Sequence, residues 1–280
     1  MTTALRYAVF GQPIAHSLSP RVHAMFAKEL DIALDYRAIE AGRDDFARAL
    51  GAFADGGGVG ANVTLPLKQD AFALCASVDD RARRCGSVNT LIRDGTKWRG
   101  DSTDGAGFVR DLHARYAFEL QGRSCLLLGA GGAARAVAFA LADAGVGTLL
   151  IANRTHERAH ELATAIGAAN VDAVAWNALG HIGAFDLVVH ATAAGHGDAS
   201  FEWPTVPIDA HTLACDLSYG AAAAPFLARA QALGARAIDG LGMLVEQAAE
   251  SFFIWHRRAP DTAAVFDALR RERPLPNDGS

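Results

Sequence analysis

A glycine-rich turn between an apolar run and an alanine-rich helical pattern constrains the fold of this chain more than any other feature. The run 125–128 leads directly into Gly129, Gly131 and Gly132. A strand, a glycine turn and a helix in this order are what a dinucleotide-binding βα turn needs, because glycine permits the tight turn and lets backbone N–H groups approach a pyrophosphate. The alternative is an ordinary glycine-rich loop. The candidate cofactor residues of the turn are Gly129, Ala130, Gly131, Gly132 and Ala133.

Strand and helix signals alternate along most of the chain, which predicts an α/β protein. After the glycine turn the alternation predicts a parallel sheet covered on both faces. The segment 105–240 is expected to form a Rossmann-type domain, and 1–104 together with 241–280 a second α/β domain to which the last helices return. Expected strands cover 7–10, 35–40, 60–63, 88–93, 97–99, 125–128, 148–152, 171–174, 187–190, 213–217 and 235–238. Expected helices cover 20–30, 44–53, 105–116, 156–166, 224–233, 241–255 and 261–271.

The overall composition indicates a soluble cytoplasmic protein. The formal net charge of −5 gives no basic face of the kind that nucleic-acid binding requires. No apolar run approaches the roughly 18 residues of a membrane span. The four cysteines lack the spacing of metal ligands and are expected to be reduced.

The end of the second Rossmann strand favours NADP over NAD. An NAD site carries a carboxylate there for the ribose 2′-hydroxyl, whereas this chain has Asn153, Arg154 and Thr155, with Arg158 one turn later. Two guanidinium groups suit a 2′-phosphate because they donate bidentate, charge-assisted hydrogen bonds. The alternative is a solvated helix N-terminus in which Arg158 pairs with a neighbouring glutamate.

A zinc-hydrolase motif overlaps the same position. The segment from His156 to His160 matches H-E-x-x-H, which on a helix places two imidazoles on one face. It begins where an exposed Rossmann helix begins, and no third ligand follows it. We therefore expect no metal site.

Polar clusters follow the strands of the N-terminal domain, where an α/β fold places its site. Ser17 and Ser19 precede a helix that begins with proline, so their hydroxyls suit a carboxylate or a helix cap. Lys68 begins a helix, where its charge opposes the helix dipole and a purely structural role is unfavourable. Two more clusters occupy 86–90 and 100–107.

Taken in order, these motifs resemble those of the shikimate dehydrogenase family, and the resemblance covers nearly the whole chain. The matching segments are Ser-Leu-Ser-Pro at 17–20, Asn-Val-Thr-Leu-Pro-Leu-Lys at 62–68, Val-Asn-Thr at 88–90, Thr-Asp-Gly at 103–105, Gly-Ala-Gly-Gly-Ala at 129–133, Asn-Arg-Thr at 153–155 and Asp-Gly-Leu-Gly-Met-Leu-Val-Glu-Gln at 239–247. The resemblance implies NADPH-dependent reduction of 3-dehydroshikimate to shikimate on the route to chorismate and the aromatic amino acids.

The resemblance also implies roles for individual residues. Lys68 and Asp104 would form the acid–base pair, which agrees with the proton that ketone reduction must deliver to oxygen. The substrate carboxylate would be held by Ser17, Ser19, Thr64 and Tyr219, and the ring hydroxyls by Asn62, Asn89, Asp104 and Gln247. Thr192, Gly240 and Met243 would join the glycine turn and the Asn-Arg-Thr segment in binding the cofactor.

The chain departs from the usual family pattern at Ala24, Ser102, His190 and Ala193. His190 ends an apolar strand, where an imidazole is more often buried and hydrogen-bonded than catalytic. One alternative function is the quinate/shikimate branch of the family, with relaxed substrate or NAD use. Another is a catalytically silent nucleotide-binding regulator, although such a protein has no need of Lys68 and Asp104 together. A monomer or a homodimer is expected.

Overall fold

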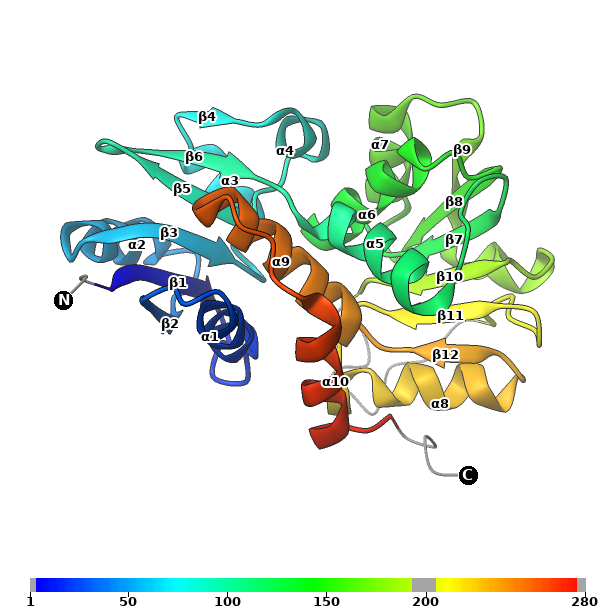
Figure 1. Cartoon of the computed structure of the whole chain (residues 1–280). Coiled ribbons are helices and arrows are strands. Elements are labelled where there is room, and N and C mark those ends of the chain that lie inside the picture. The colour runs from blue at the N-terminus through cyan, green and yellow to red at the C-terminus, as the bar shows by residue number, and fades with distance from the viewer. Residues whose placement is uncertain (1–3, 193–204, 276–280) are drawn as a thin grey trace. The chain divides into compact units, whose positions relative to one another are not determined.

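The computed structural model describes residues 4–192 and 205–275, so Ala193 lies outside the described residues. The chain divides into two compact units, one formed by residues 1–107 and 244–266 and the other by 108–243 and 267–280. The domain limits expected from the sequence stay a prediction. Each unit has its own six-stranded sheet, and both are visible in Figure 1.

The first unit is built on a mixed sheet with the strand order β2-β1-β3-β5-β6-β4. Its strands are β1 (Leu5–Gly11), β2 (Leu34–Glu40), β3 (Gly58–Val63), β4 (Ser77–Val78), β5 (Thr90–Asp94) and β6 (Lys97–Asp101). The helices in this part of the chain are α1 (Ser19–Glu29), α2 (Phe46–Asp55), α3 (Lys68–Leu74) and α4 (Asp80–Cys85). β1 lies parallel to β2 and β3, so polar residues after β1 and β3 share one edge of the sheet.

One face of this sheet forms an apolar core against α2 and α3. Phe10, Phe46 and Leu67 are almost fully buried there, and the rings of Phe10 and Phe46 meet edge to face with centroids 5.7 Å apart. Burial of large apolar side chains is the dominant favourable contribution to folding. The core therefore fixes the strand ends that carry the polar residues.

The second unit is a fully parallel sheet with the order β12-β11-β10-β7-β8-β9. Its strands are β7 (Ser124–Leu128), β8 (Thr148–Asn153), β9 (Val171–Ala175), β10 (Leu187–His190), β11 (Leu213–Asp216) and β12 (Arg236–Ile238). Its helical segments are α6 (Gly132–Asp143), α7 (His156–Ile166), η1 (Trp176–His181), η2 (Gly220–Ala222) and α8 (Ala224–Ala232). The strand order reverses between β7 and β10, which is where such sheets bind ligands.

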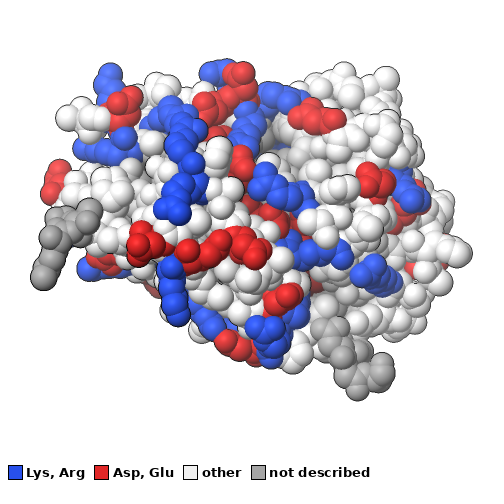
Figure 2. Space-filling model, in the orientation of Figure 1, with Lys and Arg blue, Asp and Glu red and all other residues white. Residues whose placement is uncertain are grey.

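Three further helices contain the boundaries between the units: α5 (Asp104–Tyr116), α9 (Leu241–His256) and α10 (Thr262–Glu272). The two-domain α/β class expected from the sequence is confirmed. The short elements β4 and α4 were not expected. No helix in the described ranges 4–192 and 205–275 is both long and apolar enough to cross a bilayer. On the face drawn in Figure 2, basic and acidic side chains are interspersed.

Candidate active site

The loops after β1 and β3 are held side by side in the first unit. The Thr64 N–H donates to the Phe10 carbonyl oxygen at 2.8 Å, and the Gln12 N–H donates to the Leu65 carbonyl oxygen at 3.0 Å. Gly11 has no side chain, which lets the Thr64 methyl group lie against it. This pairing brings the segment that carries Ser17 and Ser19 toward the segment that carries Thr64 and Lys68.

Lys68 and Asp104 form a nearly buried ion pair. Lys68 Nζ lies 2.5 Å from Asp104 Oδ2, and the two side chains are 11% and 6% exposed. Asp104 begins α5, where a carboxylate is favoured by the helix dipole. Lys68 begins α3, where the dipole is unfavourable to its charge, so the aspartate supplies the compensation that a desolvated ammonium group needs.

Asn89 connects this pair to α9. Its Nδ2 group lies 2.9 Å from Asp104 Oδ1, 3.0 Å from Gln247 Oε1 and 2.8 Å from Thr103 Oγ1. Its Oδ1 accepts the Thr103 N–H at 2.8 Å. Because Asn89 is only 2% exposed, these hydrogen bonds hold Asp104 and Gln247 in one arrangement.

Asn62 occupies the neighbouring position and is 5% exposed. Its Nδ2 donates to Ser251 Oγ at 3.0 Å, and its Oδ1 accepts the Tyr36 hydroxyl at 2.7 Å. Burial raises the pKa of Tyr36 well above its ordinary value, so this hydroxyl remains a donor at neutral pH. The site residues Lys68, Asp104, Asn89, Gln247 and Asn62 are therefore joined by one hydrogen-bonded network.

The residues expected to hold a carboxylate are less tightly tied together. The Ser19 N–H donates to Ser17 Oγ at 3.3 Å, while Ser19 itself is 6% exposed. The N-cap residue of α1 makes no side-chain hydrogen bond to the helix. The alternative in which one of the two serines caps the helix is therefore represented only by the contact between the Ser19 N–H and Ser17 Oγ. Thr64 is half-buried at the end of β3. Tyr219 lies before η2 and belongs to the second unit.

The glycine turn of the second unit has the form that a dinucleotide needs. Gly129 has φ +126°, and a β-carbon there would lie 2.8 Å from the Ala191 carbonyl oxygen. Gly131 is the N-cap of α6 and supplies no side-chain cap; a β-carbon on it would meet no atom within 4 Å. The first N–H groups of α6 therefore open onto space that an anionic pyrophosphate fits.

The end of β8 carries the expected phosphate-binding groups. Asn153 Nδ2 donates to the Thr155 carbonyl oxygen at 2.9 Å, which folds the loop before α7. Arg154, Thr155 and Arg158 are exposed there. His156 and His160 are exposed on α7 as well, and no group of three or more His, Cys, Asp or Glu residues that could hold a metal ion occurs in the described part of the chain.

The other expected cofactor residues follow β10 and β12. Thr192 comes two residues after the end of β10, and its Oγ1 lies 2.7 Å from His190 Nε2. The Gly240 N–H donates to the Ser218 carbonyl oxygen at 2.8 Å, and Gly240 packs against Leu217 so closely that a β-carbon would overlap it. Met243 is 6% exposed in the first turn of α9.

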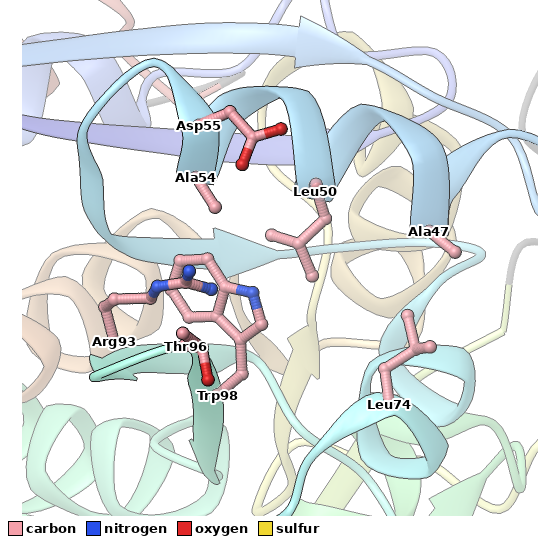
Figure 3. A pocket seen from close by; sticks show the side chains of 9 residues that line it. Ala47, Leu50, Ala54, Asp55, Leu74, Arg93, Thr96 and Trp98 are labelled. Atoms are coloured by element: carbon pink, nitrogen blue, oxygen red, sulfur yellow. The ribbon is translucent and has the colours of Figure 1, made fainter.

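A pocket elsewhere in the first unit is separate from this network. Figure 3 shows it between α2, α3 and the β5–β6 hairpin. Its volume is about 440 Å³. Its lining residues are Ala47, Leu50, Gly51, Ala54, Asp55, Leu74, Arg93, Thr96 and Trp98. None of them is a site residue expected from the sequence. The Arg93 guanidinium lies over the Trp98 ring, 5.1 Å from its centroid.

Four residues that support the network were given no role from the sequence: Tyr36, Thr90, Thr103 and Ser251. Thr90 Oγ1 lies 2.7 Å from Ser251 Oγ, and Ser251 Oγ also donates to the Gln247 carbonyl oxygen at 3.0 Å. Ser251 follows Gln247 by four residues on α9, and that helical spacing is the one signal that points to it. Tyr36 lies in β2, far from Asn62 in sequence, and carries no such signal.

Three protein-family models match the chain. The model for the shikimate dehydrogenase substrate binding domain matches residues 9–91. The model for shikimate / quinate 5-dehydrogenase matches residues 112–198, and that for the shikimate 5′-dehydrogenase C-terminal domain matches residues 240–270.

Whole-chain similarity leads to the same family. A shikimate dehydrogenase (NADP(+)) from Xanthomonas euvesicatoria pv. vesicatoria is 56% identical over 269 residues, covering 95% of each chain. A protein of the same name from Xylella fastidiosa is 52% identical, covering 97% of this chain and 98% of its own. The crystal structure of a Thermus thermophilus shikimate 5-dehydrogenase in complex with NADP(H) and shikimate has a TM-score of 0.82 and 36% identity over 95% of this chain and 99% of that one. The chain therefore belongs to the shikimate dehydrogenase family.

Proposed function

We propose that this chain catalyses the reversible, NADPH-dependent reduction of 3-dehydroshikimate to shikimate, a step toward chorismate and the aromatic amino acids. The observation that carries the proposal is the 2.5 Å ion pair between Lys68 and Asp104, nearly buried within a network of amides and hydroxyls. The relatives at 52–56% identity support the substrate and the cofactor by name.

Lys68 acts as the general acid in this proposal. NADPH supplies the hydride when it is bound. As negative charge grows on the carbonyl oxygen, the Lys68 ammonium group stabilises it and delivers the proton, which leaves a neutral amine that solvent reprotonates. Asp104 orients the Lys68 side chain through their 2.5 Å contact, and Asn89 in turn holds the second carboxylate oxygen of Asp104 at 2.9 Å.

The amide side chains bind the ring hydroxyls. Asn62, Asn89 and Gln247 are fixed by their neighbours, so their donors and acceptors are positioned before substrate arrives. Ser17, Ser19, Thr64 and Tyr219 bind the carboxylate through hydroxyl groups. A substrate lacking one of these polar groups would leave buried partners unsatisfied, which gives the site its specificity.

The cofactor binds along the carboxyl edge of the second sheet. The open N-terminus of α6 at Gly131 takes the pyrophosphate, and Arg154 with Arg158 takes the 2′-phosphate. The remaining residues of the cofactor site are Asn153, Thr155, Thr192, Gly240 and Met243. A carboxylate that would prefer a 2′-hydroxyl is missing from the Asn153–Thr155 segment.

The test is absorbance at the reduced-nicotinamide band with purified protein, with NADP or NAD supplied against shikimate or quinate. The proposal predicts rapid reduction of NADP with shikimate and much slower reduction in the other three mixtures. Equal rates with quinate or NAD would favour the quinate/shikimate branch. No reduction with any pair, from a protein that still binds NADP, would favour the silent regulator.

We also propose that the protein works as a cytoplasmic monomer or homodimer. Each unit carries its own sheet and core, so the fold of one chain does not depend on a partner. Sedimentation at catalytic concentrations distinguishes the two states, and a larger assembly would contradict the proposal.

A further inference from the structure

A buried histidine–aspartate pair lies at the carboxyl edge of the second sheet. His190 and Asp216 are register partners at the ends of the neighbouring strands β10 and β11. His190 Nδ1 lies 2.8 Å from Asp216 Oδ2, and both side chains are 1% exposed. The imidazole stacks on Phe226 at 5.0 Å, which fixes the plane of the ring. This pair is not part of the proposed acid–base chemistry of Lys68.

The polar groups of the pair can be ordered into one hydrogen-bonded chain. Asp216 Oδ1 accepts the Ser218 N–H at 2.8 Å, which leaves Oδ2 to accept a proton carried by His190 Nδ1. In a neutral imidazole with that tautomer, Nε2 is an acceptor. Thr192 Oγ1, 2.7 Å from Nε2, is then within reach to donate its proton to the ring.

Thr192 lies beside the glycine turn. β10 pairs with β7, and the Ala191 N–H donates to the Leu128 carbonyl oxygen at 2.8 Å. A β-carbon on Gly129 would lie 3.1 Å from Thr192 Cγ2, so the threonine adjoins the residue that begins the turn. The turn at Gly129 and the open N-terminus of α6 fit a dinucleotide, as described above. Thr192 is therefore placed at the edge of that site.

We propose that Asp216, His190 and Thr192 form a relay that orients the Thr192 hydroxyl for the cofactor. With its proton committed to His190, Thr192 Oγ1 presents acceptor lone pairs, and these bind a hydroxyl or amide donor of the dinucleotide. His190 and Asp216 act through Thr192 and are positioning residues. The inference rests on the proposed function, because it needs the dinucleotide at the turn.

The first test measures the tautomer of His190 in the unmodified protein. The ¹⁵N chemical shifts of labelled histidine, recorded at pH 8, distinguish a protonated Nδ1 from a protonated Nε2. The relay predicts a proton on Nδ1 alone. A proton on Nε2, or on both nitrogens, overturns it, and no variant is needed for this result.

The second test reverses the relay with Asp216→Asn. The asparagine carbonyl takes the place of Oδ1 because the Ser218 N–H requires an acceptor, so the amide nitrogen faces His190 Nδ1 and donates to it. Nε2 then carries the proton and donates it to Thr192 Oγ1. The lone pair that accepts this proton is no longer available to a donor of the cofactor. Thr192→Val removes the hydroxyl and keeps the methyl group that packs near Gly129.

The readout is the dissociation constant of NADP+, measured by titration calorimetry for the two single variants and the double variant. Each single variant is expected to weaken binding by about tenfold, the loss of one good hydrogen bond. In the Thr192→Val background, Asp216→Asn is expected to change binding by less than about twofold, because neighbours that act through one contact are not additive. Equal effects of Asp216→Asn in both backgrounds would overturn the relay.

A fragment of the cofactor locates the donor. The same three variants can be titrated with 2′-phospho-ADP-ribose, which lacks nicotinamide. The effects of Asp216→Asn and Thr192→Val on binding remain non-additive if the donor is a hydroxyl of this fragment, and neither substitution affects binding if the donor is the carboxamide. Either result supports the relay. If the unmodified protein fails to bind NADP+, the proposed function is rejected together with the relay, whereas NADP+ binding without coupling rejects the relay alone.

Discussion

Gly129 lies so close to Ala191 that a β-carbon on the glycine would stand 2.8 Å from the Ala191 carbonyl oxygen. Gly129 also has φ +126°, a backbone conformation that only glycine adopts readily. Gly129→Ala is therefore expected to lower the free energy of unfolding by about 1–3 kcal/mol and to weaken NADP+ binding. Urea denaturation and titration calorimetry measure the two effects.

Gly131→Ala is the matched control for that substitution. Gly131 has φ −78°, and a β-carbon there meets no atom within 4 Å, so stability is expected to stay within about 0.5 kcal/mol. The new methyl group would stand where the pyrophosphate approaches, and NADP+ affinity is expected to fall. Unchanged affinity would show that the dinucleotide does not cross the N-terminus of α6.

The arginines after β8 are expected to set the preference for NADP over NAD. Replacing Arg154 and Arg158 together by alanine removes charge-assisted donors to the 2′-phosphate, which predicts a rise of about tenfold or more in KM for NADP+. KM for NAD+ should hardly change. Arg229→Ala, which replaces an exposed arginine on α8 in the same unit, serves as the control. Parallel changes in both KM values would contradict a role in recognising the phosphate.

Asn89 is expected to matter for stability as well as for binding. Asn89→Ala leaves the buried Thr103 N–H and Asp104 Oδ1 each without one hydrogen bond. An unsatisfied buried group costs about 1–3 kcal/mol, so the free energy of unfolding should fall by at least that amount. The exposed Asn177→Ala is the control and should shift it by less than about 0.5 kcal/mol. A loss of activity with no loss of stability would mean that Asn89 does not hold the network together.

His23 makes the stability of the first unit depend on pH. Burial lowers the pKa of His23 to about 3 in the folded protein, from 6.5 in the unfolded chain. Between these values the unfolded chain binds more protons, so the free energy of unfolding falls as the pH falls below about 6.5, by at most about 1.4 kcal/mol per pH unit. The part of the free energy of unfolding that depends on a neutral His23 is fully present above pH 6.5 and is lost as the pH falls below that value.

His23→Phe tests that dependence and keeps a ring against Tyr36, on which His23 stacks at 4.3 Å. Urea midpoints between pH 7.5 and 4.5 should decline less steeply in the variant than in the parent. Identical slopes would show that His23 does not contribute to the loss of stability in acid.

The elements with a strong local signal were predictable from the sequence. The apolar run before Gly129 lies inside β7, and β5 and β6 overlap the strands expected at 88–93 and 97–99. α4 was not expected, because Asp80–Cys85 is short and charged and has little apolar periodicity. Its stability comes from tertiary contacts, in which Arg81 holds Asp101 at 2.6 and 2.8 Å and Glu250 at 3.0 Å.

The site shows the same contrast between local and tertiary information. Lys68 and Asp104 could be predicted as site residues from their motifs, whereas the hydrogen-bonding partners of each side chain could not. Asn89 and Gln247 are separated by 158 positions, and Asn62 and Ser251 by 189. Only the folded sheet and α9 bring such pairs within hydrogen-bonding distance, so residue periodicity carries no information about them.

The most direct test of the account is the kinetics of Lys68→Ala. Loss of the general acid is expected to lower kcat for shikimate oxidation and for 3-dehydroshikimate reduction by about 10²–10⁴-fold. The dissociation constant of NADP+ should stay within about twofold, because Lys68 is assigned to the substrate and not to the cofactor. Lys97→Ala, an exposed lysine on β6, is the control and should leave both values unchanged. Near-normal turnover, or a fall in NADP+ affinity as large as the fall in kcat, would contradict the assignment of Lys68 as the catalytic acid.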